Sequence, residues 1–324
     1  MNVLRMTGAD KKKTAVVALG GNAITLPGQE DNITNQFANT RNSLGGIIEL
    51  ARNGYKLVVT HGNGPQVGNA LLRVELARGR APELPLGVLV ADTEGGMGYM
   101  IEQSLQNRLR VEGIDRPVVT IITQMLVNRD DPAILNPTKY VGQFYNEVEA
   151  TVFSETRGWQ MKQDANRGWR RVVPSPVPYK AVEGDTIKRL VADGTIVIAG
   201  GGGGIPVYVD DKGNYEGIDA VIDKDLASAV LGNEIGAGIL SILTSVDKVS
   251  LNFGRPDQVD LDELTVSELK EYLRAGQFPP GSMGPKIQAA IAFIENGGDL
   301  VTITSFANAA QAVFGKAGTR IIPG

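Results

Sequence analysis

Short apolar runs recur along the chain, and longer stretches of mixed polarity separate them. Within each run nearly every residue is apolar, rather than every second one, and Val, Ile and Thr are frequent. This pattern predicts strands that are buried on both faces, as in a parallel sheet. The six runs are residues 15–19, 56–60, 118–123, 195–199, 239–244 and 299–304.

Amphipathic helices are predicted between these strands. In two stretches, apolar residues recur at i, i+3, i+4 and i+7, a spacing that lines one face of a helix. They are Leu44, Ile47, Ile48 and Ala51 in the first stretch and Ile287, Ala290, Ile291 and Ile294 in the second. Strands that alternate with helices in this way predict an α/β fold, a three-layer αβα sandwich with a mainly parallel central sheet.

One long segment, residues 124–178, interrupts the alternation. It is rich in Asn, Pro, Arg and aromatic residues, and it contains both tryptophans, Trp159 and Trp169. We interpret it as a small protruding lid subdomain inserted in a single domain of residues 1–324. A second polar segment, 252–264, is expected to be a loop that precedes a helix at 266–275.

Composition excludes several classes of chemistry. The chain has no cysteine and one histidine, His61, so disulfides, thiolate catalysis and multi-histidine metal centres are ruled out. A formal net charge of −4 argues against nucleic-acid and anionic-membrane partners. Because no apolar run approaches the roughly 20 residues of a membrane span, we expect a cytoplasmic protein without a signal peptide.

Glycines follow three of the predicted strands. Gly20 and Gly21 precede Asn22, Gly62 precedes Asn63, and residues 200–204 are all glycine. In open parallel sheets, ligands bind beyond the carboxyl ends of the strands, where bare backbone amides bind anions. A tight turn would explain any single pair, but the three together favour a phosphate or carboxylate site.

The familiar nucleotide motifs are absent from the sequence. A Walker A loop needs Ser or Thr after Gly-Lys, whereas Gly315 and Lys316 are followed by Ala317. The dinucleotide fingerprint needs a third glycine, which residues 62–67 and 200–205 both lack. A nicotinamide-dependent dehydrogenase is therefore not favoured.

Two lysines stand at predicted helix starts. Lys224 lies between Asp223 and Asp225, and Lys286 follows Pro285. Asp223 can be read simply as a helix cap. A lysine is different, because the positive end of the helix dipole disfavours a cation there. The two lysines therefore indicate a polyphosphate ligand.

Seven segments, in order, resemble the carbamate kinases, a branch of the amino acid kinase superfamily. They are VVALGGNAI (16–24), HGNGPQVGN (61–69), NPTK (136–139), GWRRVVPSP (168–176), GGGGIP (201–206), VIDKDLAS (221–228) and PGSMGPK (280–286). The resemblance implies a homodimer that exchanges a phosphoryl group between MgATP and carbamate, giving ADP and carbamoyl phosphate reversibly. It also implies a role in the breakdown of arginine and carbamoyl phosphate.

The resemblance further implies the roles of individual residues, with acceptor binding in the N-terminal part and nucleotide binding in residues 195–324. Lys139, Lys224 and Lys286 are expected to be catalytic, with Asp225 holding the lysine ammonium groups. Acceptor and transferred phosphoryl are assigned to Gly20, Gly21, Asn22, Gly62 and Asn63, and the nucleotide to Gly201, Gly202, Ser245, Phe253 and Met283. No protein metal site is expected, because Mg²⁺ would be carried by the nucleotide.

Two departures from the wider pattern stand out. At the end of the first strand, the sequences of acetylglutamate kinases resemble the motif Lys-x-Gly-Gly, whereas this chain has Ala18 in place of the lysine. Residues 91–98 of this chain read ADTEGGMG, whereas the corresponding segment of carbamate kinases more often resembles Ser-Gln-Gly. This difference is expected to alter the lining of the site or an interface but not the reaction.

Other interpretations stay open at this point. The chain could be another kinase of the superfamily, acting on a small carboxylic acid or a phosphonate, or a non-catalytic nucleotide sensor. His61 is interpreted as a hydrogen-bonded strand-end residue rather than a catalytic one. Trp169, Arg170 and Arg171 fit packing and surface charge of the lid, although either arginine could reach an anion.

Overall fold

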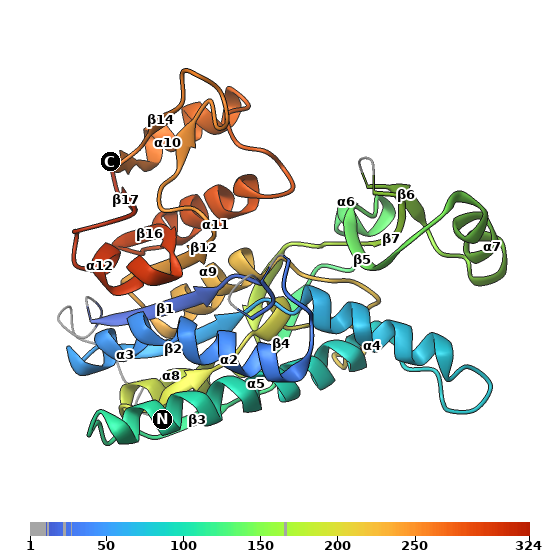
Figure 1. Ribbon diagram of the computed structural model, residues 1–324, viewed down its shortest axis with the longest axis horizontal. Helices are drawn as coiled ribbons and strands as arrows, with labels where there is room; N and C mark the ends of the chain where they lie inside the picture. The colour runs from blue at the N-terminus through green and yellow to red at the C-terminus, as the bar shows by residue number, and fades with distance from the viewer. Residues whose placement is uncertain (1–10, 12, 22–23, 27, 165–166) are drawn as a thin grey trace.

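All six predicted runs become strands of one eight-stranded sheet, in the order β15-β17-β16-β12-β1-β2-β9-β3 (Figure 1). The computed structural model describes residues 11, 13–21, 24–26, 28–164 and 167–324. The strands are β1 Thr14–Leu19, β2 Lys56–His61, β3 Val118–Thr120, β9 Ile196–Ile198, β12 Ile239–Thr244, β15 Glu263–Thr265, β16 Leu300–Ser305 and β17 Thr319–Ile322. Every pairing in this sheet is parallel except that of β16 with β17, so the mainly parallel sheet is confirmed.

Helices cover both faces of this sheet, which confirms the three-layer sandwich. Along β1, Ala15, Val17 and Leu19 pack on one side and Val16 on the other, as an extended strand requires. On the first side lie α2 Ile33–Ser43, α3 Gly45–Arg52, α5 Leu86–Val111 and α12 Ala309–Val313; on the second lie α8 Gly184–Ala192, α9 Lys224–Ile235, α10 Val266–Arg274 and α11 Met283–Glu295. The two predicted amphipathic patterns correspond to α3 and α11.

A second sheet of four strands continues the first, in the order β11-β10-β4-β8. Its strands are β4 Gln124–Val127, β8 Pro178–Ala181, β10 Ile205–Val209 and β11 Tyr215–Gly217. β3 and β9 pair in the large sheet, and β4 and β10, which follow them in the chain, pair in the small one. The glycine run 200–204, which contains the short helix η2 Gly201–Gly203, therefore lies where the chain passes between the sheets.

A lobe of residues 139–173 protrudes from this body (Figure 1). It consists of β5 Lys139–Tyr145, α7 Glu147–Arg157, β6 Met161–Gln163 and β7 Trp169–Val173. The expected insertion 124–178 begins with β4, which belongs to the four-stranded sheet, whereas α6 Pro132–Leu135, which follows β4 in the chain, lies beside the strands of the lobe (Figure 1). The lobe packs on α4 Gly64–Leu76, where a Cβ built on Gly68 would lie 3.4 Å from Cα of Gly142.

The polar segment expected to be a loop contains short strands instead. β14 Val259–Asp260 pairs with β13 Ser250–Leu251, and β15 begins at Glu263. These strands are too short to produce a recognisable apolar pattern.

Another short helix, η3 Phe306–Asn308, follows β16. Among the described residues, no helix combines the length and the apolar character needed to cross a bilayer.

Candidate active site

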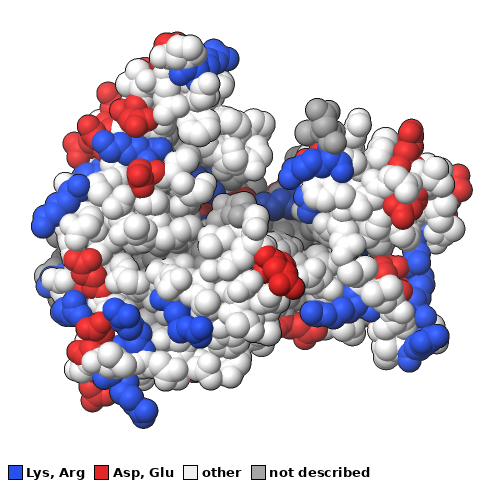
Figure 2. Space-filling model, viewed as in Figure 1, with Lys and Arg blue, Asp and Glu red and all other residues white. Residues whose placement is uncertain are grey.

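A cleft of about 300 Å³ opens where the ends of β1 and β2 meet the first turns of α9 and α11 and the start of β5. The molecule is hollowed between the lobe and the C-terminal part, and Lys or Arg side chains lie inside the hollow (Figure 2). The cleft is lined by Gly21, Gly62, Asn63, Lys139, Gly202, Asp223, Lys224, Asp225, Ser282 and Lys286, among others. Segments far apart in the sequence thus meet at one edge of the sheet, as an open parallel sheet requires.

Asp225 holds two lysines together in this cleft. One carboxylate oxygen accepts a hydrogen bond from Lys224, and the other accepts one from Lys286 at 2.9 Å. Only 2% of Asp225 is exposed. Burial by itself would raise the pKa of Asp225, but the two ammonium groups outweigh it and lower that pKa to about 2. Asp225 is therefore ionised throughout the physiological range.

The first turn of α9 places these groups. Asp223 is the N-cap residue, and its Oδ1 accepts a hydrogen bond from the N–H of Asp225 at 3.0 Å. Its Oδ2 accepts one from Lys139 Nζ at 2.9 Å. Asp223 is thus both a helix cap and the partner of a lysine, a pairing that the sequence pattern alone does not indicate. Lys139 stands at the start of β5, so it marks the boundary between body and lobe.

Backbone groups form the opposite wall of the cleft. Gly62 lies against Gly21 and Lys224, since a Cβ built on Gly62 would be 3.3 Å from the N atom of Gly21 and 3.6 Å from Cδ of Lys224. Asn63 is buried, and its Nδ2 donates to Thr93 Oγ1 at 3.0 Å. Gly20 lies behind this wall, where its Cβ would meet the carbonyl oxygen of Leu243. Asn22, also predicted as an acceptor ligand, lies outside the described residues.

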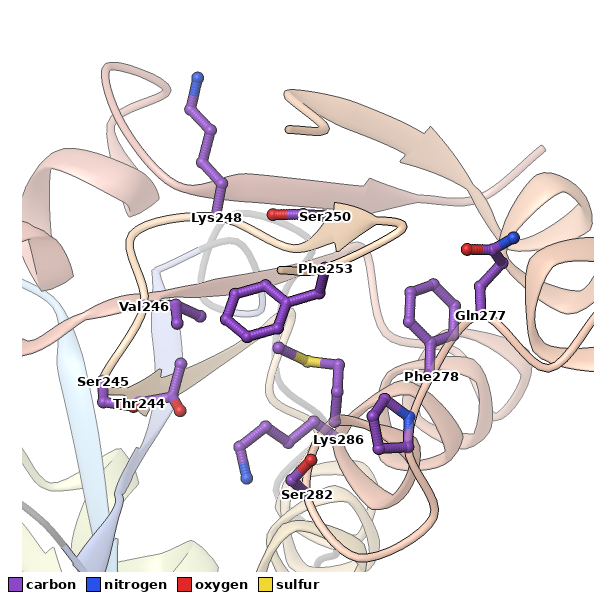
Figure 3. A pocket seen from close by; sticks show the side chains of 12 residues that line it. Thr244, Ser245, Val246, Lys248, Ser250, Phe253, Gln277, Phe278, Ser282 and Lys286 are labelled. Carbon is purple, nitrogen blue, oxygen red and sulfur yellow. The ribbon is translucent and has the colours of Figure 1, made fainter. Parts of the chain in front are cut away.

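A second pocket of about 340 Å³ adjoins the cleft. It contains three of the predicted nucleotide residues, Ser245, Phe253 and Met283, and it shares Ser282 and Lys286 with the cleft. Figure 3 shows the ring of Phe253 between Val246 and Phe278, with the ammonium group of Lys286 at the lower end of the pocket. An apolar slot that ends at a lysine fits a base at one end and phosphates at the other.

Gly201 and Gly202, which were also predicted to bind the nucleotide, do not line this second pocket. Gly202 lines the cleft instead, and Gly201 is buried against His61. Gly202 has a φ of +66°, and a Cβ there would lie 2.1 Å from Nδ2 of Asn63, so a side chain cannot be accommodated. The bare backbone brings β9 close to the end of β2, a packing role that the glycine pattern alone cannot distinguish from phosphate binding.

His61 is neutral and buried at the end of β2. Burial lowers its pKa to about 4, a hydrogen bond to the carbonyl oxygen of Gly62 partly opposes this, and Lys224 lowers the pKa further. The ring contacts the glycine run rather than lining the cleft. This arrangement agrees with the interpretation of His61 as a hydrogen-bonded strand-end residue.

The two lid arginines are engaged by groups of the protein. Arg170 donates to Asp164 and to the carbonyl oxygen of Gly142, and Arg171 donates to Asp219 at 3.3 Å. The guanidinium of Arg171 also lies 4.9 Å from the ring centroid of Trp159. Neither arginine lines the cleft or the adjoining pocket, so packing and charge pairing account for both.

Comparison with known proteins identifies the family to which this chain belongs. Residues 13–305 match the model of the amino acid kinase family. The carbamate kinase of Pyrococcus horikoshii is 48% identical over 310 residues, 95% of this chain and 98% of that protein, and that of Pyrococcus furiosus is 47% identical over 96% and 99%. A carbamate kinase from Giardia lamblia bound to AMP-PNP superposes with a TM-score of 0.91 at 42% identity, covering 97% of this chain and all of the other. The chain therefore belongs to the amino acid kinase family and, within it, to the carbamate kinases.

Proposed function

We propose that this carbamate kinase uses the cleft to transfer a phosphoryl group between ATP and carbamate, with the nucleotide base in the adjoining pocket. One observation supports this assignment most directly: Lys286 lines both cavities and is held, together with Lys224, by the buried carboxylate of Asp225. A base bound beside Phe253 would therefore direct its phosphates toward a pair of preorganised cations. Lys139 supplies a third cation from the other side.

The chemistry requires positioning and charge neutralisation rather than a base. An oxygen of carbamate is already anionic, so it can attack the γ-phosphoryl group without losing a proton. During transfer, negative charge spreads over the phosphoryl oxygens and grows on the leaving oxygen of ADP. Lys139, Lys224 and Lys286 would stabilise that charge, while the backbone amides near Gly21 and Gly62 would hold the acceptor.

Magnesium would enter this site bound to the nucleotide. The two carboxylates that face the cleft, Asp223 and Asp225, are both paired with lysines. Within the described ranges, no group of three or more His, Cys, Asp or Glu side chains has the geometry of a metal site. Mg²⁺ commonly keeps its waters and binds substrate phosphates, which fits a site that offers lysines. The ion would neutralise phosphate charge while the lysines orient the transferred group.

An assay of ATP formation tests the proposal. The purified protein is given MgADP and carbamoyl phosphate, and ATP is measured by a coupled reaction; acetyl phosphate, and ATP with acetylglutamate, serve as alternative substrates. We expect ATP from carbamoyl phosphate and no phosphorylation of acetylglutamate, since Ala18 occupies the position of the lysine in the resembled acetylglutamate kinases. Equal activity on acetylglutamate would reject the assigned specificity. No activity with carbamoyl phosphate would reject the function.

We also propose a homodimer that acts in carbamoyl phosphate breakdown, both on the basis of the family. A molar mass near twice the 34.5 kDa of the chain, measured by light scattering after gel filtration, would support the dimer. A mass equal to that of one chain at micromolar concentration would reject it.

A further inference from the structure

Glu94 is a buried carboxyl group for which the proposed reaction has no use. It lies in α5, within the segment 91–98 where the sequence departs from the resembled pattern, and 2% of it is exposed. Its Oε2 accepts a hydrogen bond from the N–H of Thr123 at 2.7 Å. In the part of the chain that the structure describes, its Oε1 has no hydrogen-bond partner, and no cation stabilises either oxygen.

These surroundings favour the protonated acid. One N–H donor cannot replace the hydration that an ionised carboxylate loses on burial. Burial accordingly raises the pKa of Glu94 well above its usual value, the N–H of Thr123 lowers it in part, and Glu183 raises it. Among the described residues, the charge of Glu183, the N-cap residue of α8, acts on Glu94, and His61, at the end of β2, packs on the same glycine as Glu94, Gly201. His61 is neutral and supplies no opposite charge.

Glu94 is connected to the glycine run 200–204 in two ways. A Cβ built on Gly201 would lie 3.1 Å from Cγ of Glu94 and 2.4 Å from Nε2 of His61, so both side chains pack on this glycine. In addition, Thr123 links Glu94 to the run, because its Oγ1 accepts a hydrogen bond from the N–H of Gly200 at 2.9 Å. The position of the glycine run, which directly follows β9, therefore depends on the position of Glu94.

The glycine run in turn shapes the cleft. Gly202 lines the cleft and lies directly against the side-chain amide of Asn63. The same amide donates to Thr93, the residue before Glu94. Two adjacent residues of α5 thus hold the two components of this wall, with Thr93 holding Asn63 and Glu94 holding the glycine run.

We propose that Glu94 is a positioning residue that, in its protonated form, holds the glycine run against Asn63 and so preserves the acceptor end of the cleft. An ionised carboxylate at this position must be hydrated, and water can reach it only if α5 and the glycine run separate. Acceptor binding and turnover then decline as the pH rises. This inference rests on the proposed function for its kinetic consequence.

The test compares wild type with Glu94→Gln, whose amide oxygen still accepts from Thr123 but which cannot ionise. The kcat and KM for carbamoyl phosphate are measured between about pH 6 and pH 10, where essential ionisations shape the rate profile. We expect the kcat and KM of Glu94→Gln to stay within about threefold of the wild-type values at neutral pH, because the two side chains have nearly the same size and shape. The decline in its kcat/KM at alkaline pH is expected to be absent, or to occur at least about one pH unit higher than in wild type.

Glu102→Gln is the matched control. Glu102 lies two turns further along the same helix and accepts a hydrogen bond from Thr120 Oγ1 at 2.7 Å, but it is partly exposed and away from the cleft. This variant is expected to keep the alkaline decline of wild type. An unchanged alkaline decline in Glu94→Gln, or its disappearance in Glu102→Gln as well, would overturn the proposal.

A second pair of variants tests the link through Thr123. Thr123→Val removes the acceptor of the Gly200 N–H, whereas Thr123→Ser retains it. We expect the valine variant to lose about 10- to 100-fold in kcat/KM, the usual effect of a small misplacement, and the serine variant to recover most of it. Equal activity of the two variants would show that Thr123 does not transmit the position of Glu94, and would overturn the proposal.

Melting temperatures separate this proposal from the proposed function, because they need no turnover. A buried acid whose pKa is raised binds a proton in the native state that it lacks when unfolded, so wild type should lose stability relative to Glu94→Gln as the pH rises. If wild type forms no ATP from carbamoyl phosphate, the proposed function fails, but this melting difference still supports a protonated Glu94. Parallel melting curves at all pH values would overturn the proposal.

Discussion

The ammonium group of Lys139 donates to Oδ2 of Asp223 at 2.9 Å, although the two residues are 84 positions apart in the chain. Lys139 belongs to the lobe, and Asp223 caps α9 in the body. The ion pair therefore holds the lobe lysine at the cleft beside Lys224 and Lys286. Asp223 and Asp225, two residues apart on one helix start, together hold all three predicted catalytic lysines.

Lys139→Ala is expected to impair turnover more than it impairs binding of ADP. Lys139 lines the cleft but not the pocket with Phe253, so its charge acts on the transferring group rather than on the nucleotide base. Steady-state kinetics combined with calorimetry of ADP binding measures both effects. Lys162→Ala is the control, since Lys162 is in the same lobe and donates to the carbonyl oxygen of Pro137. A large rise in the Kd for ADP with unchanged kcat would show that Lys139 is an ordinary nucleotide contact.

Lys224→Met and Lys286→Met are each expected to lower kcat by about 10²- to 10³-fold, the usual effect of removing one preorganised donor. The fold should persist, because both ammonium groups face the cleft. Circular dichroism and melting temperature check the fold, and single-turnover kinetics checks the chemical step. Lys270→Met is the control: Lys270 pairs with Glu295 and lines neither the cleft nor the adjoining pocket. Near-normal turnover in either cleft variant would remove that lysine from the mechanism.

Asp225→Asn is expected to affect stability as well as activity. Without the carboxylate, two ammonium groups remain close together, and breaking a buried ion pair in this way costs about 3–5 kcal/mol. Because the pKa of Asp225 is lowered to about 2, its contribution is present above the usual Asp pKa and is lost as the pH falls through about 4 toward 2. Urea unfolding of both proteins between these pH values measures it. A stability difference that stays constant as the pH falls would contradict the ion-pair assignment.

Sequence patterns predicted the strands that are buried on both faces, because continuous apolar runs leave few other structures possible. The long helix α5 escaped prediction, since it contains Gly95, Gly96 and Gly98, and glycine is unfavourable in the interior of a helix. Its Gly98 packs on Thr120, a close approach that only the tertiary structure explains. The antiparallel strand β17 was also missed, because its residues 319–322 carry no sign of the partner strand they join.

The resemblance predicted the three lysines of the cleft and the role of Asp225 in holding lysine ammonium groups, but it did not predict the partner of Lys139. The pairing of Lys139 with Asp223 depends on where the lobe docks. The lobe docks on α4 through the close approach of Gly68 and Gly142 and through an apolar cluster that includes Leu71 and Val141. No local pattern encodes such a contact between two glycines in different elements. The same holds for Glu94, which looks like an ordinary polar residue of a helix until its burial against Gly201 is known.

His61 offers a direct test of the burial at the end of β2, because it is the single histidine of the chain. Burial lowers its pKa to about 4, so the ring should remain neutral well below the usual histidine value of about 6.5. In an untagged protein, the two ring nitrogens of this one imidazole give the histidine side-chain signals of a nitrogen-15 NMR titration, and these report its protonation without ambiguity. We expect the signals to keep the shifts of a neutral ring down to about pH 5.

The same burial has a consequence for stability that can be measured separately. The unfolded chain takes up a proton at His61 near pH 6.5 while the native state does not, so native stability falls by about 3 kcal/mol as the pH drops from about 6.5 to 4. His61→Gln removes this ionisation, and the difference between wild type and variant in free energy of unfolding should shrink by that amount over the same range. A titration midpoint near 6.5 in the native protein, or a stability difference independent of pH, would mean that the ring is hydrated and that the packing of His61 against Gly201 is wrong.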